Sequence, residues 1–360
     1  MTRTGKLLTA GLLISSGLLA GCGDDATGGT GTPTPGPAQT FDYVINSITV
    51  DQANGMAPNP ATATAGVAGF DLDNLKSTPA DAMMRGTAAC SHADFFSTLD
   101  SDQNTGTCAA GAARGGASCQ GGVDNQLPEI AATVQGFGTD IRATLTEQLQ
   151  QGKVAILVRV ANVNGTPGPS LNDSAVDVYL YPIGRPMFAS CSNIGMVGQN
   201  YAVDSSSLMG GNDLIANAQY HYTGSIVNGR LRIAPPAGST TANFTFNLPV
   251  MGMNIPLALF KTQLRVDMTA DRGANGNLGG YAQLAPLASM LGALLPAGIP
   301  ISTVQTVLQS LVDIQDPSGN AMGCTAPNGG ISLGLGFTTV RANIQAAPVT
   351  GAQMGMCGSN

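Results

Sequence analysis

Residues 226–233, IVNGRLRI, decide the fold class, because they place Asn228 and Gly229 between two short runs rich in apolar side chains. An Asn-Gly pair in this setting is the strongest short-range signal for a tight hairpin, since both turn positions require a positive φ angle. The flanking runs suit strands that bury one face. We therefore expect two antiparallel strands joined by a two-residue turn.

Similar strand patterns recur on both sides of this hairpin. Within 66–74, Phe70 and Leu72 alternate with Asp71 and Asp73, so the two pairs lie on opposite strand faces. Residues 153–163 form a nearly continuous apolar run, which is typical of a central strand. Further strands are expected over 41–51, 174–183, 242–248, 264–268 and 331–337.

Helices are expected in two parts of the chain. Apolar residues spaced by three and four over 126–151 predict an amphipathic helix with a break near Gly136 and Gly138. The apolar stretch 284–301 approaches the length of a membrane span, but its prolines divide it into two short helices, about 281–295 and 301–313. The elements together predict a mainly β protein, an antiparallel β-sandwich with a few packed helices.

Composition excludes several classes of protein. The 360 residues carry 15 Lys and Arg against 22 Asp and Glu, a net charge of −7, which excludes the basic surface of a nucleic-acid-binding protein. Hydrophobic residues make up 43%, which is enough to build a core and argues against a disordered chain.

Residues 1–21 have the pattern of a signal peptide. Arg3 and Lys6 precede the apolar run Leu7–Ala20, and Leu19–Cys22 resembles the site at which bacterial lipoproteins are cleaved and lipidated on cysteine. We expect a lipid on Cys22. The alternative is an ordinary secretory signal followed by a chance cysteine.

Residues 22–40 are rich in Gly, Thr and Pro and predict a flexible tether between the anchor and a folded body. Gly23 follows the lipidated cysteine, where inner-membrane lipoproteins commonly carry Asp. The expected location is the outer membrane, contacted through the lipid. Asp24, one position later, keeps the inner membrane open as an alternative.

Six cysteines follow the anchor, an even number that suggests three disulfides in an exported chain. Cys324 and Cys357 flank the last predicted strand and are the favoured pair. Free buried thiols are the alternative. The six are Cys90, Cys108, Cys119, Cys191, Cys324 and Cys357.

Acidic loops suggest a calcium site. Alternating Asp and Asn side chains in Gly-containing loops supply the several oxygen ligands that Ca²⁺ requires. The alternative is that these side chains cap turns in solvent. The candidate ligands are Asp71, Asp73, Asp100, Asp102, Asn104 and Asp124.

Catalytic motifs are missing from the sequence. His92 and His221 are the only histidines, neither lies in a metalloprotease motif, and the chain has no phosphate-loop pattern. The single G-x-S-x-G spacing, GISLG at Gly330–Gly334, falls within the strand expected over 331–337 and lacks the strand-to-helix turn of a nucleophile elbow. We assign no catalytic residue. An enzyme, if present, would be an envelope hydrolase acting on a glycan or an ester.

A resemblance supports this interpretation. Several short motifs are similar to a group of largely uncharacterised myxobacterial lipoproteins: GFDLD at Gly69–Asp73, the Cys-spaced loop after it, GVDN at Gly122–Asn125, GNLGG at Gly276–Gly280 and the closing GISLGLGFTTV after Cys324. The resemblance implies a β-sandwich of jelly-roll type and supplies no activity.

The sequence therefore predicts an outer-membrane lipoprotein with one body over 41–360 and an insertion over 77–125. Its expected role is a non-enzymatic surface or periplasmic binding module, stabilised by calcium if the acidic loops converge. The ligand, a protein or a glycan, is not specified by any motif.

Overall fold

The structure is a computed structural model, and it describes residues 37–50, 69–70, 72, 125–136, 138, 140–188, 190–233, 242–250, 253–294, 300–314 and 329–346. All of them belong to one unit, Gly36–Asn360.

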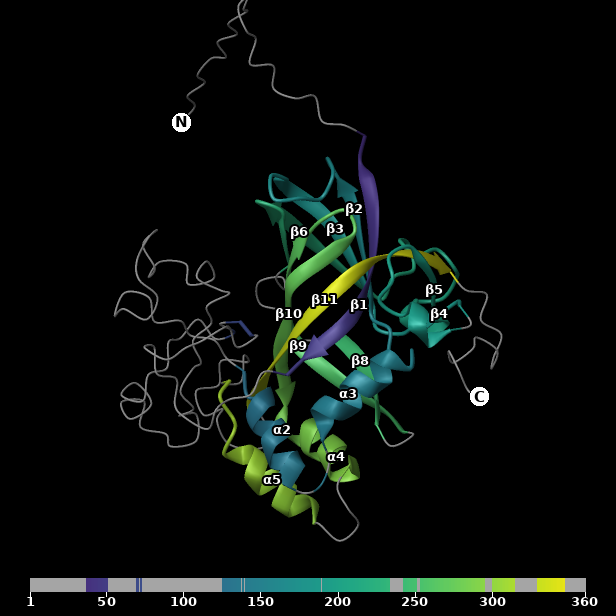
Figure 1. Ribbon diagram of the computed structural model, residues 1–360. Coiled ribbons are helices and arrows are strands. Elements are labelled where there is room, and N and C mark those ends of the chain that lie inside the picture. Colours follow the sequence, from purple (N-terminus) through teal and green to yellow (C-terminus); the bar gives the residue numbers. More distant parts are fainter. Residues whose placement is uncertain are drawn as a thin grey trace, which may run out of the picture. The chain divides into compact units, whose positions relative to one another are not determined.

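Eight antiparallel strands form a closed barrel. Each strand pairs with the next along the chain, and the last, β11, also pairs with the first (Figure 1). The strands are β1 Gln39–Thr49, β2 Leu157–Val163, β3 Asp173–Tyr181, β6 Tyr220–Val227, β7 Arg230–Ile233, β9 Met253–Met268, β10 Arg272–Gln283 and β11 Gly330–Ala346.

This closure confirms a mainly β fold and corrects the expected β-sandwich. Side-chain alternation shows that each strand buries one face, but two packed sheets and one closed sheet both satisfy that pattern. The difference lies in β11, whose residue Phe337 pairs with Gly276 of β10 on one side and with Ile48 of β1 on the other. The sheet therefore has no free edge along this seam.

The predicted hairpin is confirmed. Val227 of β6 pairs with Arg230 of β7, and the two residues between them have φ angles of 52° at Asn228 and 76° at Gly229. These positive values are those that a two-residue hairpin turn requires.

The barrel is longer on one side than on the other. The short strand β7 pairs with 264–267 of β9, and β8 (Ala242–Val250) then pairs with 253–260 of the same strand. Because β8 runs in the same direction as β7, it extends the wall beyond the point where β7 ends. The longer wall leaves an open end that other elements cover.

Helices cover that end of the barrel (Figure 1). They are α2 Leu127–Gly136, α3 Ile141–Gln150, α4 Leu284–Leu294 and α5 Ile301–Gln309. The predicted break in 126–151 is confirmed: Gly138 has a φ of 90°, and the Asp140 carboxylate accepts the Ala143 N–H at 3.1 Å to cap α3. The division of 281–313 into two helices is also confirmed.

Within the described residues, no helix is both long and apolar enough to cross a membrane.

One segment packs on the outside of the barrel between β3 and β6. It contains β4 Gly184–Pro186, β5 Gln199–Val203 and the short 3₁₀ helices η1 Cys191–Asn193 and η2 Ser205–Ser207. Strand β5 runs parallel to the end of β11. Tyr201 and Val203 pack there against Tyr179 and Tyr181 of β3, forming a second apolar cluster outside the main core.

Candidate functional site

An apolar cavity lies where the helices meet the open end of the barrel. Its volume is about 50 Å³. Its walls come from α2, α3 and α4, from the extended parts of β9, β10 and β11, and from the end of β1 and the residues just before β2. The lining residues are Ile48, Leu127, Ile130, Ile141, Thr144, Leu145, Val154, Ile156, Leu257, Leu259, Leu278, Leu287, Met290, Leu291, Leu333 and Leu335.

Among the described residues the lining is aliphatic, and its single polar member is Thr144. The Thr144 hydroxyl donates to the Asp140 carbonyl oxygen at 2.7 Å within α3, so it is already used inside the helix. None of the lining residues is ionisable. The cavity therefore offers contact area to an apolar group and little hydrogen bonding to fix a polar one.

The middle of the barrel is closely packed. A much smaller cavity of about 10 Å³ lies among Tyr43, Val158, Leu231, Phe337 and their neighbours. The Tyr43 hydroxyl donates to the Thr269 carbonyl oxygen at 2.8 Å, and burial raises the pKa of this phenol far above its usual value. Any occupant of the larger cavity therefore sits at the end of the barrel and not along its axis.

The four helices, called here the helical cap, are held to the barrel by a buried polar cluster. The Asp313 carboxylate, which follows α5, accepts the Ser332 N–H at 2.9 Å and also the Ser332 hydroxyl. The Gln126 N–H, just before α2, donates to the Ser332 carbonyl oxygen at 2.9 Å, and the Gln126 side chain bonds the Asp313 carboxylate. One residue of β11 therefore fixes the end of α5 and the beginning of α2.

Asn125 strengthens the same attachment. Its side-chain oxygen accepts the Gly334 N–H at 2.8 Å and the Leu127 N–H at 3.0 Å, while its amide nitrogen donates to the Gly334 carbonyl oxygen at 3.2 Å. We call Asn125, Gln126, Asp313 and Ser332 the latch; all four are buried. Leu333 and Leu335, on the opposite face of β11, line the cavity.

Burial dominates the electrostatics of the latch. It raises the pKa of the Asp313 carboxyl to about 7, although the hydrogen bonds from Ser332 act in the opposite direction. No sequence pattern pointed to Asp313, because a single Asp after an apolar helix is usually exposed. Its burial follows from the pairing of Ile314 with Gly330, which draws this stretch against β11.

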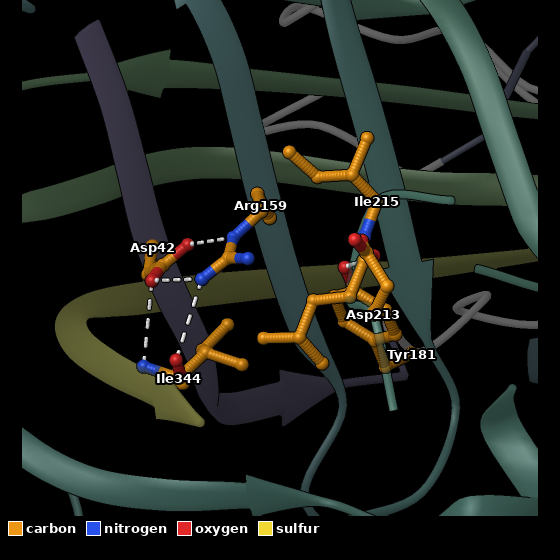
Figure 2. A network of polar contacts seen from close by, with 7 residues as sticks. Asp42, Arg159, Tyr181, Asp213, Ile215 and Ile344 are labelled. Carbon is orange, nitrogen blue, oxygen red and sulfur yellow. Dashed lines mark hydrogen bonds and ion pairs between the residues drawn. The ribbon is translucent and has the colours of Figure 1, made fainter. Parts of the chain in front are cut away.

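A second polar network lies on the outer face of the barrel (Figure 2). The Arg159 guanidinium of β2 donates to the two carboxylate oxygens of Asp42 at 2.7 and 2.8 Å, and to the Ile344 carbonyl oxygen at 3.3 Å. Nearby, the Tyr181 hydroxyl bonds the Leu214 carbonyl oxygen of the external segment. The hydrogen bonds that Arg159 donates to Asp42 raise the pKa of this guanidinium above its usual value. These contacts stabilise the barrel seam and present no open site.

His221 lies on the exposed surface of β6. Its Nε2 is 2.8 Å from an Asp177 carboxylate oxygen, and its ring stacks on Tyr179 with centroids 4.6 Å apart. With 48% of its side chain exposed, it does not line the apolar cavity. The geometry suits a surface packing role.

The proposed calcium ligands lie outside the described residues: Asp71, Asp73, Asp100, Asp102, Asn104 and Asp124. Phe70 and Leu72, which flank Asp71 in the sequence, are described, as is Asn125 after Asp124. The Leu72 carbonyl oxygen accepts a hydrogen bond from the Lys261 ammonium at 2.7 Å. The Arg265 guanidinium carbon lies 6.0 Å from the centroid of the Phe70 ring. In the described part of the chain, no group of three or more metal-binding side chains occurs. The calcium site stays a prediction.

The predicted lipid attachment site, Cys22, and five of the six other cysteines also lie outside the described residues. Cys191 is described and begins η1. The three disulfides and the pairing of Cys324 with Cys357 stay predictions.

Comparison of the chain with protein-family models, curated proteins and solved structures gives no significant match.

The cavity was not predicted from the sequence, although several of its walls were. Leu127, Ile130, Ile141 and Leu145 were recognised as one apolar helix face, and Leu333 and Leu335 as one strand face. An apolar stripe indicates that a face is buried but does not say how fully its partner fills the space. The gap depends on the unequal lengths of the barrel walls.

Proposed function

We propose that the protein is a non-enzymatic binding module of the cell envelope that holds an aliphatic chain between its helical cap and the end of its barrel. The supporting observation is the cavity, which has fifteen aliphatic residues and Thr144 in its lining. Ligand sites commonly occupy the mouths of barrels and are lined mainly by apolar side chains.

The chemistry of the lining favours a flexible aliphatic ligand over an aromatic one. Its residues are Leu, Ile, Val and Met with one Thr, and no aromatic ring is present to stack on a planar ligand. Each methylene group that leaves water for such a site contributes about 0.8 kcal/mol. A chain of several methylenes would therefore bind without any polar contact in the cavity.

The size of the cavity makes the helical cap part of the binding event. An engineered cavity of roughly 150 Å³ holds benzene, whereas this cavity measures about 50 Å³. A chain must therefore separate the helices from the barrel wall as it enters. A thin acyl chain requires less separation than a bulky ligand of the same area.

The same observations disfavour the hydrolase alternative at this site. Hydrolysis requires a nucleophile or an acid–base pair beside the substrate. Among the described lining residues the only hydroxyl is that of Thr144, which is engaged with Asp140, and the His221–Asp177 pair lies on an exposed strand face. A bound chain would remain unchanged.

The predicted lipid on Cys22 supplies a setting for this binding. A lipid-anchored body stays close to the acyl chains of phospholipids and lipoproteins. We propose that such a chain is the natural occupant and that the protein acts at the outer membrane.

The test is a displacement experiment on the full chain carrying Cys22→Ser, which removes the predicted lipid and permits purification without detergent. We expect radiolabelled dodecanol, used as the probe, to bind and unlabelled dodecanol to displace it. Ile130→Phe fills the cavity and should weaken probe binding by about tenfold, a loss of about 1.4 kcal/mol.

Val266→Ile serves as the control, because it adds one methyl group in the smaller cavity and leaves the larger one untouched. It should bind the probe as the parent does. Equal probe affinity in the parent and in Ile130→Phe would place the binding elsewhere and overturn the proposal.

A further inference from the structure

The latch joins the two ends of the helical cap at a single point of the barrel. Ser332 bonds Asp313 after α5 and Gln126 before α2, and Gly330 exchanges backbone hydrogen bonds with Ile314. Leu127 and Ile130, within the first turn of α2, line the cavity. Movement of α2 away from the barrel therefore requires the latch to loosen.

No charged side chain of the described residues is bonded to the Asp313 carboxylate. Its partners are Ser332 and Gln126, both neutral. Among the elements packed around it, α4 and α5 contain no ionisable residue, and α2 contains only Glu129. Strand β11 carries Arg341, eleven residues from its beginning, and β10 contributes Tyr281 beside Gly330 and the distant Arg272.

A protonated carboxyl fits this cluster better than an ionised one. The Gln126 side-chain oxygen is buried and has no hydrogen-bond partner among the described residues. A protonated Asp313 has an O–H to donate, and rotation of the Gln126 amide would let that oxygen accept it. The ionised form would instead leave a buried negative charge with no cation bonded to it among the described residues.

We propose that the latch is a proton-controlled closure of the aliphatic-chain site: it holds the helical cap shut while Asp313 is protonated and loosens as the proton is lost. This inference rests on the proposed function for its meaning, but the closure itself can be measured without a ligand.

The direction follows from linkage. The buried carboxyl has a pKa of about 7, and an exposed Asp has a pKa of about 4. Opening the cap exposes Asp313 and releases its proton, so opening becomes easier as the pH rises through this interval and levels off above it. The equilibrium constant for opening of the cap rises by at most about tenfold per pH unit.

The experiment is hydrogen–deuterium exchange of the full chain carrying Cys22→Ser, at pH 5.0 and 7.5, corrected for intrinsic exchange rates. We expect protection of residues 127–134 and 311–314 to fall by about tenfold or more at the higher pH, while β6 and β7 change little. Asp313→Asn retains the shape and cannot ionise, so its protection should not depend on pH. Asp204→Asn, a carboxylate of the external segment, is the matched control and should behave as the parent.

Equal pH dependence in the parent and in Asp313→Asn would overturn the latch. If Asp313→Asn fails to fold, carbon-13 NMR titration of the parent decides: a midpoint near that of an ordinary Asp, about 4, overturns the proposal, and one above about 6 supports it. Binding of radiolabelled dodecanol, the same probe, is measured on the same samples. A pH-dependent cap that never binds the probe would retain the latch and reject the proposed function.

Discussion

Arg159 of β2 bridges Asp42 of β1 and Ile344 of β11, and it therefore joins three strands at the place where the barrel closes (Figure 2). Asp42 and Arg159 are directly opposite each other in the β1–β2 ladder. Their side chains are only 15% and 13% exposed, so the ion pair is largely shielded from water. The charged pair thus stabilises the seam between the first and last strands.

Removal of Arg159 should destabilise the fold. Arg159→Met keeps much of the apolar stem but leaves the Asp42 carboxylate shielded and without its cation. We expect a loss of about 2–3 kcal/mol in the free energy of unfolding, below the full range for a buried pair because some solvent reaches it. Urea denaturation followed by circular dichroism measures this.

The ion pair between Arg185 and Asp204 provides the comparison. Arg185 is 36% exposed, so Arg185→Met should cost less than about 1 kcal/mol. Similar losses of unfolding free energy in the two variants would mean that shielding from water does not strengthen the Asp42–Arg159 pair.

Asp313 should give global stability an unusual pH dependence. Its pKa is raised in the folded state, so the folded protein binds this proton more tightly than the unfolded chain does. The stability that the fold gains from holding this proton is fully present below about pH 4 and is lost as the pH rises toward about 7. Relative to Asp313→Asn, the parent should lose on the order of 3 kcal/mol across this window, measured by urea denaturation at a series of pH values.

Asp204 gives the opposite sign and serves as the control. Burial tends to raise its pKa, but hydrogen bonds from Ser206 and the nearby Arg185 lower it overall. The stability that ionised Asp204 contributes is present above the pKa that this residue has in the unfolded chain. It is lost as the pH falls through the lower pKa that Asp204 has in the folded protein. Asp204→Asn should therefore flatten the acid limb and leave the window from pH 4 to 7 unchanged. A parent profile that matches Asp313→Asn throughout would contradict the raised pKa.

Local sequence patterns predicted individual elements well. Asn228-Gly229 specified its hairpin because a positive φ at two successive positions is a local requirement. The break between α2 and α3 was visible in the glycines, and Pro300 directly precedes α5. Each of these signals depends on the backbone of a few consecutive residues.

The closed barrel and the site depend on contacts between distant residues. Nothing in the alternation of β11 shows that Phe337 has Ile48 as a neighbour, some 290 positions away. Strand β10 was not predicted at all, because its glycines are poor strand formers. They are needed for close packing: a Cβ on Gly276 would lie 2.5 Å from the Phe337 ring. The latch depends in the same way on Asp313 meeting Ser332.

The turn at Gly229 should tolerate no side chain. Gly229→Ala would place a Cβ 2.4 Å from the Gly168 carbonyl oxygen, at a position whose φ is already 76°. We expect a loss of about 2–3 kcal/mol in unfolding free energy. Gly210 has a φ of 79° and open space around it, so Gly210→Ala isolates the cost of the backbone angle, about 1 kcal/mol. Equal losses would show that the contact with Gly168 contributes nothing.

The predicted anchor can be tested separately from the fold. Leu19–Cys22 ends a short apolar run in the pattern of a lipoprotein signal, and Cys22 is the residue that would carry the lipid. Cys22→Ala should move the protein from the membrane pellet to the soluble exported fraction. The other apolar stretch, 284–301, contributes Leu284, Leu287 and Leu291 to the core and is therefore committed to the fold.

Asp24→Asn is the matched control for this change, because it alters the tether and keeps the cysteine. Its total membrane fraction should equal that of the parent, measured by ultracentrifugation and immunoblotting. Separation of inner and outer membranes on a sucrose gradient then tests the expected location, since Gly23 after the anchor predicts the outer membrane. Retention of Cys22→Ala in the pellet after a carbonate wash would mean that the protein is held at the membrane without a lipid on this residue.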